Sequence, residues 1–174
     1  EDSIERGRLI RGEVHDDNAF AQGGVSGHAG LFSTAEDLER FCRALMDGRV
    51  LPMETLDEMT RIGQVRCYPW QGLGWWLDPC VSGANGFLPA RTAMGHTGWT
   101  GTCIWMDRAT RLYAILLSNT CHPDKTRRNN RELRRRFYTP IAAAFYPETT
   151  NAHTGLDRLV RNAFDDLRGK RLAL

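Results

Sequence analysis

Two apolar runs joined by a short polar segment constrain the fold of this chain more than any other feature. The runs span residues 102–106 and 112–118, and Asp107-Arg108-Ala109-Thr110 lies between them. Such runs around a tight turn are typical of an antiparallel β-hairpin. Because both runs are almost continuously apolar, we expect the hairpin to lie centrally, with both of its faces covered.

Helical patterns precede this hairpin. Ser33-Thr34-Ala35-Glu36 reads as a capping box beginning at the serine, and apolar residues at helical spacing then predict a helix over 34–47. A second helix is expected to follow, with Pro52 in its first turn and its end near Arg61. Between this helix and the hairpin, the alternation of apolar residues over 73–77 predicts a further strand.

A longer helix is expected after the hairpin, over 129–145, and Pro140 should interrupt or kink it. The consecutive Arg134, Arg135 and Arg136 are interpreted as a solvated face of this helix. Helices, strands and a helix in this order predict an α+β fold, in which helices cover an antiparallel sheet.

Charge and length exclude several classes of function. The 174 residues include 23 Lys and Arg against 21 Asp and Glu, a net charge of +2. This balance gives no electrostatic reason to expect nucleic acid or a membrane surface as a partner. No apolar run approaches the roughly 20 residues of a membrane-spanning helix, so no membrane span is expected in this chain.

Cysteine spacing and isolated polar pairs give little support for a metal. Five cysteines are widely spaced and form no Cys-x-x-Cys, which favours buried free thiols over zinc ligands, although up to two disulfides would fit the count. His15 and Asp16 could ligate a metal, but no third ligand stands at a recognisable spacing, and Asp is common in turns. We therefore expect neither a metal nor a cofactor.

The glycine-rich stretch Gly95-His96-Thr97-Gly98-Trp99-Thr100-Gly101 stands directly before the hairpin. Its three glycines would let another molecule approach the backbone, whose N–H groups could bind an extended ligand or an oxyanion. His96 could supply a proton or a positive charge near neutral pH. The alternative interpretation is a glycine-rich strand entry with a hydrogen-bonded histidine.

A complete set of residues for nucleophilic catalysis is not visible in the sequence. There is no Gly-x-Ser-x-Gly, no Ser-x-x-Lys, no phosphate-binding loop and no dinucleotide fingerprint. Ser26 lies in a glycine-rich loop, but the sequence shows no obvious base beside it.

Taken in order, several motifs resemble one known family. They are Val14-His15-Asp16-Asp17-Asn18-Ala19, the stretch 23–38 with its Gly23-Gly24-Val25-Ser26-Gly27-His28-Ala29-Gly30, Gly72-Leu73-Gly74-Trp75, the stretch 95–102, Leu117-Ser118-Asn119 and His122-Pro123. Together they resemble the serine β-lactamase family, specifically its class C-like β-lactamases, penicillin-binding proteins and esterases. The resemblance covers roughly residues 12–146.

This resemblance implies a partial β-lactamase/transpeptidase-like fold and acyl-serine chemistry on a β-lactam, peptide or ester carbonyl. The family takes its nucleophile and proton carriers from Ser-x-x-Lys and Tyr-x-Asn motifs, which precede the segment matched by Val14 and are absent here. We therefore expect a fragment of a serine hydrolase that is inactive alone. It would self-associate or pack against the missing N-terminal part, through apolar surface around 95–102 and Trp70, Trp75 and Trp76.

The resemblance also assigns candidate site residues. The family's Lys/His-Thr-Gly motif matches His96-Thr97-Gly98, which would line the acyl site with Trp99 as a backbone oxyanion donor. His28 and Gly30 would contact substrate. The implied partner is a cell-wall peptide or a β-lactam-like small molecule, in the periplasm or cell envelope. The alternative is a non-catalytic peptidoglycan- or peptide-binding module, which would add a peptide strand along 96–99.

The end of the chain carries a second resemblance. Residues 154–159 and 167–174 resemble the opening of the exo-β-N-acetylmuramidase family. The expected organisation is a C-terminal portion of a β-lactamase-like domain over 1–147, a linker over 148–154, and the start of a second domain, or a terminal helix, over 155–174.

Overall fold

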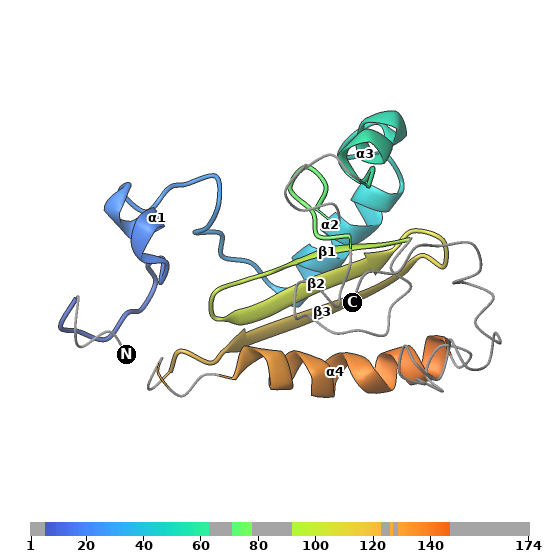
Figure 1. Ribbon diagram of the computed structural model, residues 1–174. Helices are drawn as coiled ribbons and strands as arrows, with labels where there is room; N and C mark the ends of the chain where they lie inside the picture. The colour runs from blue at the N-terminus through green and yellow to red at the C-terminus, as the bar shows by residue number, and fades with distance from the viewer. Residues whose placement is uncertain (1–5, 63–70, 78–91, 123–125, 127–128, 147–174) are drawn as a thin grey trace, which may run out of the picture.

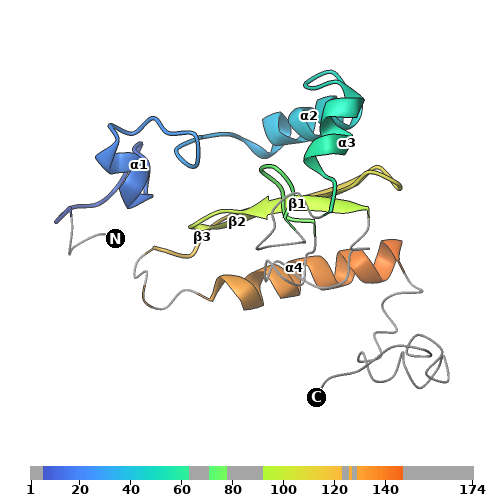
Figure 2. The same cartoon turned by 45° about the horizontal axis from the view of Figure 1, so that its top comes forward.

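A computed structural model of the chain describes residues 6–62, 71–77, 92–122, 126 and 129–146. A three-stranded antiparallel sheet lies between two helical layers (Figures 1 and 2). Helices α2 (Ala35–Met46) and α3 (Met53–Met59) cover one face, and α4 (Asn130–Phe145) covers the other. The predicted α+β class is therefore confirmed. Helix α1 (Asp17–Ala21) lies beyond one end of the sheet (Figure 1).

The sheet consists of β1 (Ala93–Thr97), β2 (Gly101–Asp107) and β3 (Leu112–Asn119), in the order β1-β2-β3. The β2–β3 hairpin confirms the predicted one, although Asp107, expected in the turn, is the last residue of β2 and pairs with Leu112. The register between β2 and β3 shifts between Gly101 and Cys103, where an irregularity interrupts the pairing.

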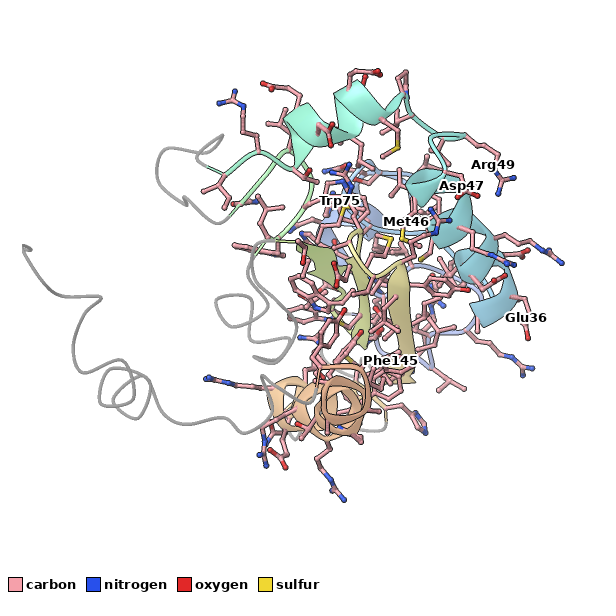
Figure 3. The ribbon with its side chains drawn as sticks, turned by 90° about the vertical axis from the view of Figure 1, so that its right-hand side faces the viewer. Glu36, Met46, Asp47, Arg49, Trp75 and Phe145 are labelled. Atoms are coloured by element: carbon pink, nitrogen blue, oxygen red, sulfur yellow. The ribbon has the colours of Figure 1, made fainter. Side chains whose placement is uncertain are left out.

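Strand β2 is buried on both faces because its successive side chains point to opposite helical layers. Cys103 and Trp105 pack with Tyr138 of α4. Met106 packs instead with Leu45 and Leu56 from the α2–α3 layer. In Figure 3, Met46 lies at the sheet side of α2, whereas the exposed Glu36 and Arg49 point outward.

The strand predicted over 73–77 is wrong. In its place Gln71 and Trp76 form an isolated bridge, and Trp76 also pairs with Gly95 of β1. A 2.8 Å hydrogen bond from the Gly72 N–H to the Trp75 carbonyl closes a tight loop. Gly74 at its tip has φ of +78°, a left-handed conformation that no regular strand contains.

Two helix starts differ from the sequence-based expectation. The N-cap of α2 is Thr34, whose hydroxyl accepts a hydrogen bond from the Asp37 N–H at 3.2 Å, so the capping box does not begin at Ser33. Ser33 instead donates to the Thr34 carbonyl. In α3, Pro52 occupies the N-cap position with φ of −52° and ψ of 144°, and therefore lies just before the first turn.

Helix α4 continues through Pro140, so the predicted interruption is wrong, and the alternative of a kink stays a prediction. The exposed proline removes the N–H that would otherwise bond the Arg136 carbonyl. Tyr138 and Ala142, on either side of it, are both buried against the sheet. Their burial explains how the helix tolerates the missing bond.

Cys42, Cys103 and Cys121 are buried free thiols, as expected, whereas Cys67 and Cys80 lie outside the described residues. The predicted linker and the terminal helix after residue 147 lie outside them too. Within the described ranges, no helix is long and apolar enough to cross a membrane. Nor do three or more His, Cys, Asp or Glu side chains converge there as metal ligands would.

A buried carboxylate ties the β2–β3 turn to the end of α4. Asp107 is 1% exposed and accepts hydrogen bonds from the Ala109 N–H at 2.9 Å, the Thr110 hydroxyl at 2.8 Å and the Tyr146 hydroxyl. Burial raises the pKa of Asp107, but the hydrogen bonds from Tyr146 and Thr110 outweigh it and hold this pKa below its usual value. Burial and the neighbouring carboxylate raise the pKa of Tyr146 to about 12.

We expect Tyr146→Phe to lower the free energy of unfolding at pH 7 by about 1.5–3 kcal/mol, because a buried carboxylate loses a donor. The folded pKa of Asp107 is depressed, so its contribution is present above the usual value of 3.8 and is lost as the pH falls below it. The difference between wild type and variant should therefore shrink in acid. Urea unfolding across this pH range measures it.

Tyr113→Phe is the matched control for this prediction. The Tyr113 hydroxyl donates to Glu39 at 2.7 Å, but Glu39 is half-buried and can exchange this partner for water. The control should therefore lose less stability. Equal losses in the two variants would contradict the role given to the buried carboxylate.

Candidate functional site

The turn between β1 and β2 gathers all four residues that the sequence marked as catalytic candidates. His96 and Thr97 end β1, and Gly98 and Trp99 lie in the connection to β2. His96 and Trp99 are exposed, while Thr97 and Gly98 are half-buried. The Gly98 N–H donates to the Thr102 carbonyl at 2.8 Å, and the Gly101 N–H donates to the Gly98 carbonyl at 3.1 Å. The placement is clear, and the catalytic role of these residues stays a prediction.

The three glycines of this stretch are required by close contacts within the chain and by its backbone conformation. A Cβ on Gly95 would lie 2.2 Å from the Ile104 carbonyl oxygen, and one on Gly98 would lie 2.1 Å from the Thr102 hydroxyl. Gly101 has φ of +106°, which favours glycine. The spacing of the three glycines therefore has a structural cause. His96 Nδ1 lies 2.9 Å from the Thr97 carbonyl oxygen, as the alternative of a hydrogen-bonded histidine expects.

Arg134 is buried beneath this turn, which corrects its interpretation as part of a solvated face. Its guanidinium donates from Nη2 to the Gly98 carbonyl at 2.8 Å and to the Thr102 carbonyl at 3.2 Å, and from Nε to the Gly101 carbonyl at 3.2 Å. Sequence reasoning missed this residue. Helical spacing could have found it, because positions 134, 138 and 142 share one face and all three are buried.

Asn130 and Thr120 hold the same turn from a second side. The Asn130 amide donates to the Trp99 carbonyl at 3.2 Å, and its oxygen accepts a hydrogen bond from the Thr120 hydroxyl. The Thr120 N–H donates to the Thr100 carbonyl at 2.8 Å. A shallow hollow results on this side of the turn. Its lining residues are Thr97, Gly98, Trp99, Asn130 and Arg134.

The segment before α2 reaches the site through one hydrogen bond. The Trp99 indole N–H donates to His15 Nδ1 at 3.2 Å. The other nitrogen of this ring, Nε2, is buried without a partner among the described residues. His15 therefore helps to fix the position of the Trp99 side chain.

His28 joins two residues near this contact. Its Nε2 lies 3.0 Å from Asp16 Oδ1, and its Nδ1 lies 2.6 Å from the Ser26 hydroxyl. Hydrogen bonds from the Ala19 N–H and then from His28 hold the pKa of Asp16 below its usual value. Ser26 thus has a base beside it, contrary to the expectation from sequence.

Gly30 serves the packing of the same loop. It has φ of +108°, and a Cβ there would lie 2.9 Å from the Gly24 carbonyl oxygen. A side chain at this position would therefore force the loop open. The substrate contacts expected of His28 and Gly30 stay predictions.

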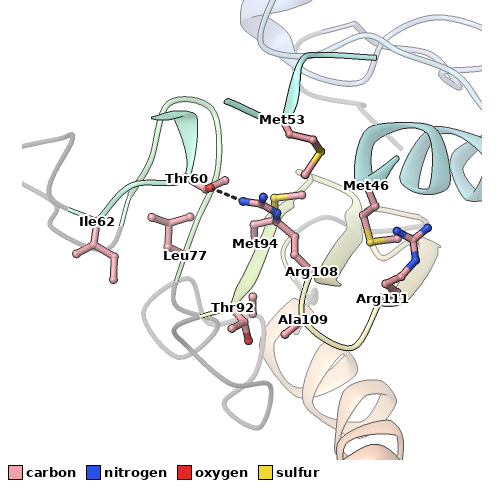
Figure 4. A pocket seen from close by; sticks show the side chains of 11 residues that line it. Met46, Met53, Thr60, Ile62, Leu77, Thr92, Met94, Arg108, Ala109 and Arg111 are labelled. Atoms are coloured by element: carbon pink, nitrogen blue, oxygen red, sulfur yellow. Dashed lines mark hydrogen bonds between the residues drawn. The ribbon is translucent and has the colours of Figure 1, made fainter. Parts of the chain in front are cut away.

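A second hollow lies at the other end of β1, between α3 and the β2–β3 turn (Figure 4). Met46, Met53, Leu77, Met94 and Arg108 are among its lining residues, and Arg108 donates to the Thr60 hydroxyl at 3.2 Å. None of the predicted site residues lines this hollow.

The sequence of this chain is similar to one protein family and to several curated proteins. The family model described as Beta-lactamase matches residues 4–139. The N-acetylmuramyl-L-alanine amidase of Bacillus subtilis strain 168 is 37% identical over 124 residues, covering 67% of this chain and 28% of the relative. The putative D-alanyl-D-alanine carboxypeptidase of Escherichia coli K12 is 33% identical over 126 residues, covering 67% and 29%.

The same description, putative D-alanyl-D-alanine carboxypeptidase, belongs to a relative from Salmonella enteritidis PT4, 33% identical over 124 residues with 67% and 29% coverage. The chain thus spans less than a third of the length of these curated relatives. No solved structure gives a significant match. The residues that resemble an exo-β-N-acetylmuramidase lie outside both the matched and the described ranges.

We expect Arg134→Met to lower the free energy of unfolding by about 2–3 kcal/mol, because three carbonyls lose a buried, charged donor. Arg135→Met is the matched control, since the exposed Arg135 pairs with Glu132 on the outer face of α4. Its unfolding midpoint should not change. Urea denaturation of the two variants compares them, and equal midpoints would contradict the role given to Arg134.

Proposed function

This chain belongs to the Beta-lactamase family, and from that premise we propose that it forms part of a serine hydrolase with acyl-serine chemistry. The whole enzyme would act on the amide carbonyl of a cell-wall peptide or on a β-lactam. The observation that carries the proposal is the β1–β2 turn, in which the His96-Thr97-Gly98 motif is followed by a backbone held in one conformation by Arg134 and Asn130.

The geometry of one peptide unit supports an oxyanion role for this turn. The carbonyl of Gly98 and the N–H of Trp99 belong to the same trans peptide, so they point in opposite directions. Arg134 and the Gly101 N–H both bond this carbonyl. The N–H of Trp99 is therefore directed away from Arg134. A preorganised backbone N–H of this kind can stabilise the negative oxygen of a tetrahedral intermediate.

His96 supports the same proposal from the end of β1. Its ring is exposed and lies 6.2 Å, between ring centroids, from Trp76. When protonated it would attract the carboxylate that ends a cell-wall peptide or that a penicillin carries. Its neighbour Thr97 lines the adjacent hollow and could donate a hydroxyl hydrogen bond to the same substrate.

On this proposal the nucleophile comes from a longer polypeptide. The 174 residues contain neither Ser-x-x-Lys nor Tyr-x-Asn, and the curated relatives are more than three times as long as the matched stretch. The names of these relatives, an amidase and a carboxypeptidase of cell-wall components, favour a peptide amide as substrate and the cell envelope as location.

A labelling experiment tests the proposal. The natural polypeptide from source cells is treated with a fluorescent penicillin and separated on a denaturing gel beside the 174-residue chain. We expect a labelled band larger than 19.7 kDa and no penicillin label on the 174-residue chain. A natural polypeptide that stays unlabelled would contradict the proposal and favour the non-catalytic peptide-binding module. A penicillin label on the 174-residue chain would contradict the proposal that the nucleophile lies outside it.

Exposed apolar side chains support the proposed packing against another part of the polypeptide. From the sequence, this surface was expected around residues 95–102 and Trp70, Trp75 and Trp76. Trp99 is exposed, but Trp75 and Trp76 are half-buried. Trp70 lies outside the described residues. Among the described residues, the most exposed large apolar side chains are instead Leu31 at 99%, Val25 at 89% and Phe32 at 69%. Neighbouring apolar residues as exposed as Leu31 and Phe32 are typical of a docking surface.

We therefore expect the 174-residue chain to self-associate through these residues. The double variant Leu31→Glu and Phe32→Glu should shift it toward the monomer, because charge opposes the burial of this segment. Val50→Glu, at an exposed apolar residue between α2 and α3, is the control and should leave association unchanged. Sedimentation velocity measures all three proteins. A wild-type chain that is monomeric at all concentrations would contradict this part of the proposal.

A further inference from the structure

Ser26, His28 and Asp16 form a continuous hydrogen-bonded array outside the proposed acyl site at the β1–β2 turn. The Ser26 hydroxyl lies 2.6 Å from His28 Nδ1, and His28 Nε2 lies 3.0 Å from Asp16 Oδ1. Asp16 stands ten residues before Ser26 in the sequence, and the loop after α1 brings the two together. The order hydroxyl, imidazole, carboxylate is that of an activated serine nucleophile.

The carboxylate determines which ring nitrogen of His28 carries the proton. An ionised Asp16 has no proton to donate, so its oxygen accepts a hydrogen bond from the Nε2–H of His28. The lowered pKa of Asp16 keeps it ionised at neutral pH. In the neutral imidazole Nδ1 is then the acceptor, and the hydroxyl of Ser26 donates to it. His28 is thus placed to take the proton of Ser26 as a general base.

We propose that Ser26 is a nucleophile for small, uncharged ester and phosphonyl electrophiles, with His28 as its base and Asp16 as the residue that positions His28. This goes beyond the proposed acyl site at the β1–β2 turn and does not depend on it. The hydroxyl lies at the edge of the loop, because Ser26 is half-buried and the side chain of its partner His28 is 49% exposed.

The reaction is a simple substitution. With a fluorophosphonate, the Ser26 oxygen forms a bond to phosphorus, the P–F bond breaks, fluoride leaves, and the hydroxyl proton passes to His28 Nδ1. With an ester, the oxygen attacks the carbonyl carbon, the bond to the alkoxide breaks, and the leaving alkoxide takes the proton back from His28. Water then releases the acid by the same steps in reverse order.

The loop around the array is held by contacts independent of the three residues' mutual bonds. The Gly24 N–H donates to the Ala19 carbonyl at 2.8 Å, and Asp16 caps α1 by accepting the Ala19 N–H at 2.9 Å. Arg6 donates to the Val14 carbonyl at 2.7 Å and stacks over the Phe20 ring at 3.9 Å. Such support preorganises a site before a substrate arrives.

The test uses the 174-residue chain and a fluorescent fluorophosphonate, followed by mass spectrometry of the labelled peptide. We expect the adduct on Ser26 and no label on Ser26→Ala. The matched control is Ser33→Ala, because Ser33 is an exposed serine on the same segment whose hydroxyl donates to the Thr34 carbonyl and not to a histidine. This variant should label like the wild type. An adduct elsewhere, or no adduct, would overturn the proposal. The hydrogen bonds of Ser26, His28 and Asp16 would then serve only to hold the loop.

Two further variants separate activation from folding. Asp16→Asn keeps an N-cap oxygen for the Ala19 N–H, so stability should hold, while the labelling rate should fall at least about tenfold because the carboxylate no longer selects the tautomer. Asp17→Asn, which loses an ion pair with Arg6, is its control and should label normally. Added imidazole should restore labelling of His28→Ala.

An Asp16→Asn variant that labels at the wild-type rate, or a His28→Ala variant that imidazole does not rescue, would overturn the assigned roles. The outcome is also distinct from that of the penicillin experiment. The proposed acyl site predicts a penicillin adduct on a serine outside these 174 residues, whereas this inference predicts a phosphonate adduct on Ser26.

Discussion

The structure depends on the burial of strand β2 on both of its faces. Cys103 and Trp105 require α4, and Met106 requires the α2–α3 layer, so neither helical layer can be removed without exposing core. The same strand fixes the site, because the turn that leads into it begins where pairing with β1 ends. Fold and candidate site therefore share one element.

Local signals in the sequence predicted the β2–β3 hairpin and the three helices α2, α3 and α4, but not α1 or β1. The β2–β3 hairpin and helices α2 and α4 each carry their own pattern of apolar residues, and those patterns match the side they bury. Predictions went wrong where backbone conformation decided the outcome. The residues around Gly74 alternate like a strand, but one left-handed glycine and one short hydrogen bond make a loop.

The residues of the candidate site could be predicted as a sequence motif, but the contacts that hold them in place could not. His96, Thr97, Gly98 and Trp99 are consecutive, so any fold keeps them together. Arg134 lies 33 residues after Gly101, and Asp16 lies 12 residues before His28, so their contacts depend on the packing of separate segments. The run of three arginines suggests a solvated surface. Arg134, however, lies on the same buried face of α4 as Tyr138.

Arg134 and Asn130 hold the β1–β2 turn through the carbonyl oxygens of its main chain. These contacts do not require a particular side chain at His96 or Thr97, whereas Gly98 and Gly101 are needed for the backbone path itself. Exchange of those side chains would change what the surface recognises without remodelling its frame. A single scaffold built this way can diversify in selectivity while the backbone geometry of the turn is inherited intact.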